Sequence, residues 1–263
     1  MSFKVQNFMN NPNMVVTEQK GCFSVIEYKK DISVHPTAAQ TAYFMSVMNV
    51  RQRQVLCNIN PMCGVAMQAG AMQWMAGDVS MTTGVKSAGD LISKGLKGKV
   101  TGESAIKPEY TGQGVVMLEP TYKHLILEEV SEWYGGMVIE DGAFLASEMS
   151  VQHEIVRRKN FSSAVAGGEG LFNLCLAGKG VAVLESPIPR NELIEIILDN
   201  DVLKIDGSMA IAWSKSLEFT VEKAGKSLIG SAASGEGLVN VYRGTGKVLM
   251  APLQPKKFPA ITL

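Results

Sequence analysis

One short apolar phrase, opened by Gly-x-Gly, occurs three times in this chain of 263 residues and constrains its fold more than any other feature. The copies read GQGVVMLEP from Gly112, GKGVAVLESP from Gly178 and GTGKVLMAP from Gly244, so each begins 66 residues after the one before. Recurrence at a fixed spacing is typical of chains built from copies of one supersecondary unit. The sequence therefore predicts three copies of such a unit.

Two further landmarks repeat with nearly the same spacing. A glycine–glutamate element precedes each phrase, as TGES, GGEG and SGEG. A turn followed by an apolar stretch forms the other, with its glycine at Gly70, Gly142 and Gly207. The first unit is longer by about one short loop, KSAGDLISKGLKGK, and repeated units tolerate such insertions at their surface.

Within each unit the pattern favours β-structure. Runs such as LFNLCL, VAVLE and VVMLE are short, apolar and bounded by glycine or proline, which is typical of buried strands. NELIEIILD has some helical character, but it occupies the same place in its unit as YKHLILEE, and we expect strands for both. Asp141-Gly142 and Asp206-Gly207 predict tight hairpins, because glycine accepts a positive φ without steric cost. Helices are expected only at residues 37–50 and near LISKGLKGK.

These elements predict a single all-β domain over residues 1–263. Three units at 51–120, 121–187 and 188–254 would pack together to bury a common core, since each alone would leave one sheet face bare. Residues 1–50 would add an N-terminal strand pair through MVVTEQKGCFSVIEY, and residues 255–263 would form a tail.

The repeated phrases resemble a known family, the altered-inheritance-of-mitochondria protein 24 family, formerly a bacterial domain of unknown function. The resemblance rests on AGAMQWMAGDVSM, TGES, GQGVVMLEP, GAFLASE, GEGLFNLCLAGKGVAVLE and GEGLVNVYRGTGKVLMAP, over roughly residues 65 to 253. It implies a fold similar to the tryptophan RNA-binding attenuation protein, of β-sandwich or double-stranded β-helix type and prone to assemble. Tryptophan or RNA binding is not implied, because a shared fold does not transmit a site. The resemblance supplies no catalytic residues, and we expect a bacterial-type member of this mitochondrial biogenesis family.

Charge argues against nucleic-acid binding, and hydropathy argues against a membrane span. The chain has 25 basic and 25 acidic residues, so no global positive field attracts nucleic acid. No apolar run reaches the roughly 18 residues of a membrane span, and the N-terminus lacks the pattern of a secretory signal. We expect a cytoplasmic protein. The inserted loop could still touch an anionic membrane surface or a partner, or be merely solvated, through its lysines, which are Lys86, Lys94, Lys97 and Lys99.

No arrangement of titratable residues predicts a catalytic, cofactor or histidine-based metal site. Cys22, Cys57, Cys63 and Cys175 follow no CxxC spacing and are expected to be reduced and mostly buried. His35, His124 and His153 are scattered, and His153-Glu154 places neighbours on opposite strand faces. AGKS resembles the end of a phosphate loop, but Thr220 stands where its first glycine would be.

The repeat itself brings three carboxylates into equivalent positions, Glu103, Glu169 and Glu236. Around a pseudo-threefold axis they could form a ring that holds a ligand or a cation. The alternative is that each glutamate is exposed or accepts a hydrogen bond from its own turn. A methionine-rich stretch is expected mainly in the core, with an exposed interaction patch as the alternative; it comprises Met62, Met67, Met72, Met75 and Met81 with Trp74.

Three hypotheses follow for function. The first is a non-enzymatic β protein that acts through self-assembly, as a homo-oligomer, or through contacts with another protein. The second is a small-ligand-binding protein with a pocket where the β units meet. The third is an enzyme that uses paired carboxylates such as Glu103 and Glu169, which would require a cleft with perturbed pKa values.

Overall fold

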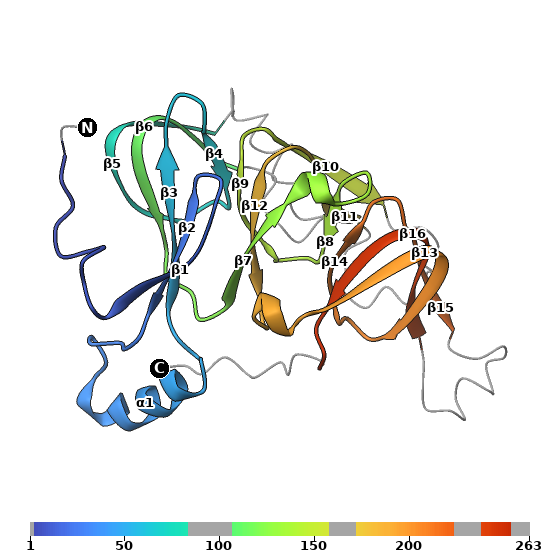
Figure 1. The fold of residues 1–263 in the computed structure, drawn as a ribbon, viewed down its shortest axis with the longest axis horizontal. Coiled ribbons are helices and arrows are strands. Elements are labelled where there is room, and N and C mark those ends of the chain that lie inside the picture. Colours follow the sequence, from blue (N-terminus) through green and yellow to red (C-terminus); the bar gives the residue numbers. More distant parts are fainter. Residues whose placement is uncertain (1–2, 84–106, 158–171, 224–237, 254–263) are drawn as a thin grey trace.

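The computed structural model describes residues 3–83, 107–157, 172–223 and 238–253. These residues form two antiparallel sheets, which confirms the all-β prediction (Figure 1). The first sheet has the order β1-β2-β3-β6-β4-β9-β12-β7, with β5 paired to β6, and the second has the order β10-β11-β8-β14-β16-β13, with β15 paired to β16. In the first sheet, the end strands β1 and β7 contact each other, so that the sheet curls nearly into a barrel.

The strands of the first sheet are β1 (Met14–Lys20), β2 (Phe23–Tyr28), β3 (Arg53–Ile59), β4 (Val65–Met67), β5 (Met72–Thr82), β6 (Glu109–Leu118), β7 (His124–Glu129), β9 (Phe144–Glu148) and β12 (Val181–Ser186). Those of the second are β8 (Met137–Ile139), β10 (Val151–Arg157), β11 (Phe172–Gly178), β13 (Ile194–Asp206), β14 (Ala210–Ser214), β15 (Glu218–Lys223) and β16 (Leu238–Met250). The helix α1 spans Ala39–Val47, and short 3-10 turns cover Pro36–Ala38, Val130–Glu132 and Arg190–Glu192.

Most expected element types are confirmed. The N-terminal strand pair is β1 and β2, the helix expected at residues 37–50 is α1, and both ambiguous segments are strands, β7 and β13. The second expected helix, near LISKGLKGK, lies outside the described residues. The prediction of strand for β7 and β13 rests on their equivalent places in neighbouring units, and the structure confirms it.

The expected Asp-Gly hairpins are wrong. Gly142 and Gly207 do adopt positive φ values of 76° and 69°, but the strands on either side of each turn do not pair with each other. β8 pairs with β11 and β14, whereas β9 pairs with β4 and β12, so the first turn carries the chain from one sheet to the other. The second turn leads from β13 to β14, which both pair with β16. The dipeptide dictates a local reversal of the chain, but it does not choose the partner of the next strand.

One pairing pattern occurs three times along the chain. β3 pairs with β6, β7 with β12, and β13 with β16, each time joining an early strand to the strand that contains or directly follows a Gly-x-Gly. The unit boundaries at 51–120, 121–187 and 188–254 stay predictions.

An apolar core holds the two sheets together. Ile126, Phe144 and Leu184 of the first sheet pack in one cluster with Ile139 and Leu176 of the second. Burying apolar surface of this kind is the main favourable contribution to folding. The two sheets therefore share a core instead of forming separate bodies.

The expectation that the methionine-rich stretch is mainly core holds for part of it only. Met67 is fully buried, Met72 packs against the core of the first sheet, and Trp74 packs on a separate cluster with Phe8. The other three methionines are exposed, namely Met62, Met75 and Met81. Side chains of a strand alternate between its two faces, and along β5 Met72 and Trp74 are partly buried whereas Gln73 and Met75 are exposed.

Candidate functional site

The three carboxylates that the repeat made equivalent, Glu103, Glu169 and Glu236, lie outside the described residues, as does the loop from Lys86 to Lys99. The carboxylate ring and the membrane or partner contact of the loop therefore stay predictions. Two other features of the described chain stand out as sites. One is an apolar surface around α1, and the other is a cluster of two cysteines and a glutamate.

The apolar surface comes from a stretch without charge. Between Asp31 and Arg51 there is no Asp, Glu, Lys or Arg, and α1, within this stretch, has no buried residue. Five large apolar side chains are each more than half exposed and define what we call the α1 surface: Ile32, Tyr43, Phe44, Val47 and Met48. In Figure 1, α1 lies at the lower end of the first sheet, outside its strands. Several large apolar side chains exposed within one short segment are typical of an interaction surface.

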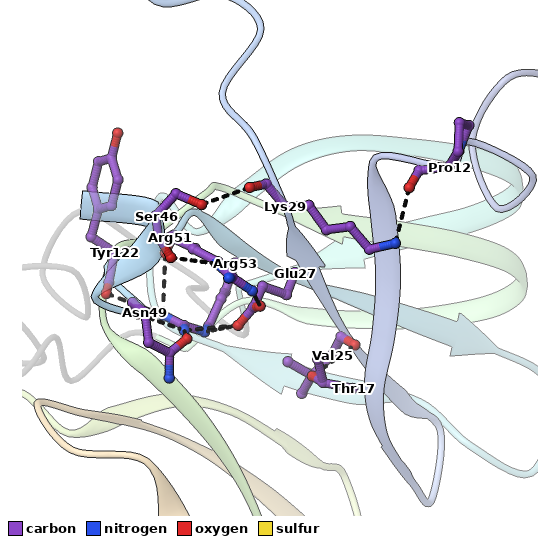
Figure 2. Close-up of polar contacts among 10 residues, drawn as sticks. All are labelled: Pro12, Thr17, Val25, Glu27, Lys29, Ser46, Asn49, Arg51, Arg53 and Tyr122. Atoms are coloured by element: carbon purple, nitrogen blue, oxygen red, sulfur yellow. Dashed lines mark hydrogen bonds and ion pairs between the residues drawn. The ribbon is translucent and has the colours of Figure 1, made fainter. Parts of the chain in front are cut away.

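Polar contacts attach the C-terminal end of α1 to the sheet (Figure 2). Ser46 Oγ donates to Lys29 O at 2.7 Å, and Arg51 Nε donates to Ser46 O at 2.9 Å. Asn49 follows the helix with a φ of 62°, a left-handed conformation that asparagine tolerates and that commonly ends helices. This turn brings Asn49 O and Oδ1 to within 3.0 and 2.7 Å of Arg53 Nη2.

Glu27 connects these contacts to the sheet. Its carboxylate pairs with Arg51 at 2.7 Å and with Arg53 at 2.8 Å. Glu27 and Arg53 are direct cross-strand partners on β2 and β3, a position in which opposite charges stabilise a sheet. The helix is thus held by polar groups at one end, while Tyr43, Phe44 and Val47 remain exposed.

The second feature is a cluster of Cys22, Cys63 and Glu148. Cys22 lies in the turn between β1 and β2, Cys63 in the turn between β3 and β4, and Glu148 at the end of β9. One ligand atom of each residue, two Sγ atoms and a carboxylate oxygen, lies within 4.8 Å of the other two. The group contains no histidine, and sequence reasoning missed it because its members are far apart in the chain and form no spacing motif.

Glu148 is fixed in this cluster from both sides. Its Oε1 accepts from the backbone N–H of Cys22 at 3.1 Å, and its Oε2 accepts from that of Val181 at 3.0 Å. Cys63 Sγ lies 3.6 Å from Oε1. A Cβ at Gly21 would overlap Oε1, so glycine is what allows the backbone to approach the carboxylate this closely.

The cluster opens onto a cavity of about 400 Å³. Asn60, Ser150 and Met149 line it beside the three cluster residues, and the part of the lining that lies within the described chain contains no Lys, Arg or His. Burial is the main cause that raises the pKa of the thiols of Cys22 and Cys63, and Glu148 raises both further. Both thiols are therefore protonated at neutral pH.

The remaining cysteines and histidines lie elsewhere. All four cysteines are free and three are buried, as expected; only Cys63 is partly exposed. His153 Nε2 lies 2.9 Å from Ser147 Oγ, and burial, reinforced by Lys107, lowers the pKa of His153 to about 4. Burial likewise lowers the pKa of His124 to about 4, with a further contribution from Arg53. Both rings are neutral at pH 7.

Hydropathy adds one finding. In the part of the chain that the structure describes, no helix combines the length and apolar character needed to cross a bilayer.

Comparisons with known proteins agree with the resemblance found in the sequence. An uncharacterized protein of Streptococcus pyogenes serotype M6 is 29% identical over 202 residues, which cover 74% of this chain and 79% of that protein. The crystal structure of a Streptococcus pyogenes protein superposes with a TM-score of 0.57 at 27% identity, covering 79% of this chain and 90% of the other. The model of the family described as mitochondrial biogenesis AIM24 matches residues 45–253. Because this match covers most of the chain, the chain belongs to the AIM24 family.

Proposed function

We propose that this protein is non-enzymatic and acts through protein contacts, beginning with self-association through the α1 surface. The observation that carries the proposal is the exposure of Ile32, Tyr43, Phe44, Val47 and Met48 within a stretch without charged residues. Leaving such side chains in water costs free energy, which burial against a second apolar surface would recover. Depletion of charge with enrichment of aromatic residues and methionine also characterises the centres of protein interfaces.

The longest edge strand is a poorer candidate for self-association. β13 ends the order of the second sheet and exposes Ile197 and Val202, which could invite another strand. It also carries Glu195, Asp199 and Asp201, and its register shifts between Leu198 and Asp201. Acidic side chains and a bulge are devices that discourage pairing of sheet edges. The α1 surface has no such protection.

A second copy of the chain is the simplest partner for the α1 surface. In a twofold dimer the same patch faces itself, so the two surfaces are equally apolar without any separate adaptation. Tyr43 and Phe44 already contact each other edge to face, with ring centroids 5.5 Å apart, and would provide aromatic area at the centre of such an interface. We therefore expect a homodimer or a larger homo-oligomer.

We further propose that the fold consists of three related units, similar to the tryptophan RNA-binding attenuation protein. The recurrent pairing of β3 with β6, β7 with β12 and β13 with β16 supports this proposal. Positive φ values at Gly112, Gly178 and Gly244, the glycines that open the repeated phrase, support it as well. The resemblance implies a fold that is prone to assemble, in keeping with the proposed self-association.

The free thiols of Cys22 and Cys63 favour a cytoplasmic location. Neighbouring thiols remain reduced in reducing compartments, whereas oxidising compartments convert suitably placed pairs of thiols to disulfides. Cell fractionation with an antibody to the native protein would test this part of the proposal, and recovery outside the cytoplasmic fraction would contradict it.

Sedimentation velocity over a concentration series tests the self-association. We expect the wild-type protein to form a discrete oligomer at micromolar concentration. The double variant Val47→Lys/Met48→Glu places two charges in the patch at no change of net charge and should weaken assembly at least about tenfold, as expected for charges buried without partners.

A matched control changes exposed apolar residues elsewhere. Ile197→Lys/Val202→Glu on β13 should assemble like the wild type, and circular dichroism should show that both double variants keep the β fold. A wild-type protein that stays monomeric at about 100 µM would overturn self-association. Loss of assembly in the β13 variant alone would place the contact on β13 instead, and equal loss in both variants would contradict a contact specific to the α1 surface.

The second candidate function is ligand binding at the cavity beside Cys22, Cys63 and Glu148. It is favoured by the position of that cavity, where the N-terminal strand pair, the turn before β4 and the end of β9 come together. A native mass spectrum distinguishes the two functions, because it reports the oligomer and any retained ligand in one measurement. A discrete multimer without added mass supports assembly, and a monomer with a reproducible added mass supports ligand binding.

A further inference from the structure

The cluster of Cys22, Cys63 and Glu148 has the composition of a metal site. Its three donor atoms lie within 4.8 Å of one another. In a tetrahedral zinc site, bonds of about 2.0 to 2.3 Å hold the donor atoms roughly 3.5 Å apart. Small side-chain rotations that shift the donor atoms by about 1 Å would therefore bring all three to bonding distance around one ion.

The backbone already holds the three segments together. The N–H of Asn58 on β3 donates to Cys22 O at 2.8 Å, and the N–H of Met149 donates to Gly64 O at 2.9 Å. These bonds tie the turn of Cys22 to β3 and the turn of Cys63 to the end of β9. The ligand-bearing turns are thus positioned by the sheet, so that little conformational freedom remains to be lost when an ion binds.

Glu148 has the support that metal-ligating carboxylates usually receive. Two backbone N–H groups bind its oxygens, and its carboxylate is confined by Gly21 and by Gly180, whose added Cβ would come within 2.9 Å of Oε2. Hydrogen bonds from surrounding groups orient ligating side chains and are part of metal sites in general. Each Glu148 oxygen keeps lone pairs that these N–H groups do not occupy.

The charges around the cavity also favour a cation. Among the residues that the structure describes, its lining offers a carboxylate and two thiols but no Lys, Arg or His to compensate them. An ion with two positive charges would displace the two thiol protons and be bound by two thiolates and one carboxylate, with a net charge of −1. Exchange of protons for metal is how cysteine sites normally load.

We propose that Cys22, Cys63 and Glu148 bind one Zn²⁺ ion, with a fourth coordination position open to the cavity. Two sulfur ligands select zinc over the oxygen-seeking Mg²⁺ and Ca²⁺. Three protein ligands with one open position are typical of zinc sites that accept water or a small molecule. The site is independent of self-association through the α1 surface, and it gives the cavity a specific ligand chemistry.

Titration with Co²⁺ tests the site directly, because cobalt occupies zinc sites and reports its ligands optically. The reduced full-length protein, stripped with EDTA and kept in a phosphine reductant, should bind one Co²⁺ per chain with a thiolate-to-metal charge-transfer band in the near ultraviolet. Added Zn²⁺ should abolish that band at stoichiometric amounts. A protein that shows no such band at micromolar concentration overturns the proposal.

Two variants and one control test the ligand assignment. Cys63→Ser and Glu148→Gln should each weaken binding of Zn²⁺ at least about tenfold, and Cys63→Ser should also halve the charge-transfer intensity for each bound cobalt. Cys175→Ala removes a buried thiol of the second sheet and should bind like the wild type. Equal weakening in Cys175→Ala and Cys63→Ser would show non-specific thiol binding and overturn the assignment. Thermal unfolding of the metal-free variants confirms that each is folded.

A further measurement separates this site from the proposed function. The sedimentation profile of the metal-free and Zn²⁺-loaded proteins should be the same, because the cluster is not part of the α1 surface. A wild-type protein that assembles but does not bind Zn²⁺ overturns only the metal site. A wild-type protein that binds Zn²⁺ but stays monomeric overturns only the self-association.

Discussion

Arg53 and Glu27 form an ion pair of 2.8 Å in which the side chains are only 4% and 13% exposed, respectively. The pair lies on neighbouring strands, and Arg53 also donates to Asn49, which follows α1. Desolvating two charges is costly unless both are paired and their remaining hydrogen-bonding groups are satisfied. Arg53 meets this condition through the carbonyl oxygens of Asn49 and Arg51, which explains how a charged side chain is accommodated inside this sheet.

Removing the carboxylate of this pair should destabilise the fold strongly. Glu27→Gln keeps the size of the side chain but leaves Arg53 as a buried charge without its counter-ion, and we expect a loss of about 3 kcal/mol in the free energy of unfolding. Urea denaturation provides the measurement. Lys123→Ala is the control, because Lys123 is 53% exposed in its pair with Glu185 and should change stability by at most about 1 kcal/mol. Similar losses in both variants would contradict this explanation.

His153 should make the fold less stable in mild acid. Burial and Lys107 lower its pKa from 6.5 to about 4, so the folded state binds the proton less readily than the unfolded state. The contribution of the neutral His153 ring to the free energy of unfolding is fully present above pH 6.5, falls as the pH decreases, and is lost near pH 4. Between pH 6.5 and 4.5 the stability should decrease by about 2 kcal/mol for this group.

The variant His153→Gln isolates that effect. Its free energy of unfolding, measured by urea denaturation, should change less between pH 6.5 and 4.5 than that of the wild type, because all other titrating groups are the same in both proteins. Parallel curves for the two proteins would show that His153 titrates equally in the folded and unfolded states. An NMR titration of the His153 ring gives the pKa directly.

Gly112, the first glycine of the repeated phrase, should not tolerate a side chain. Its φ is 118°, and a Cβ would overlap the carbonyl oxygen of Asp78 on the neighbouring strand β5. Gly112→Ala therefore combines backbone strain with a clash, and we expect a loss of at least about 3 kcal/mol. Gly70→Ala provides the matched control, with a φ of 83° but no atom within 4 Å, and should cost only about 1 kcal/mol. Equal costs measured by thermal unfolding would mean that conformation alone, and not the approach of β5, requires glycine at position 112.

The sequence was sufficient for the fold class but not for the partners of strands or for the sites. Recurrent Gly-x-Gly phrases and short apolar runs identified an all-β chain, since these signals are local and repeated three times. Asp141-Gly142 misled because a turn specifies a reversal of direction, while the next partner depends on the cores of both sheets. Cys22, Cys63 and Glu148 were not recognised together because only the folded sheet brings their separate turns side by side.

Met62 and Met67 show that the sequence also does not predict which single side chains of a stretch are buried. They stand five residues apart in one methionine-rich stretch, yet Met62 is 97% exposed beside the cavity and Met67 is fully buried on β4. Met67→Ala should cost between about 2 and 5 kcal/mol through lost burial and an unfilled cavity. Met62→Ala should stay within about 0.5 kcal/mol of the wild type. Urea denaturation of both variants at pH 7.5 checks the difference, and a large loss in Met62→Ala would show that this side chain is covered in solution, for example by a second copy of the chain.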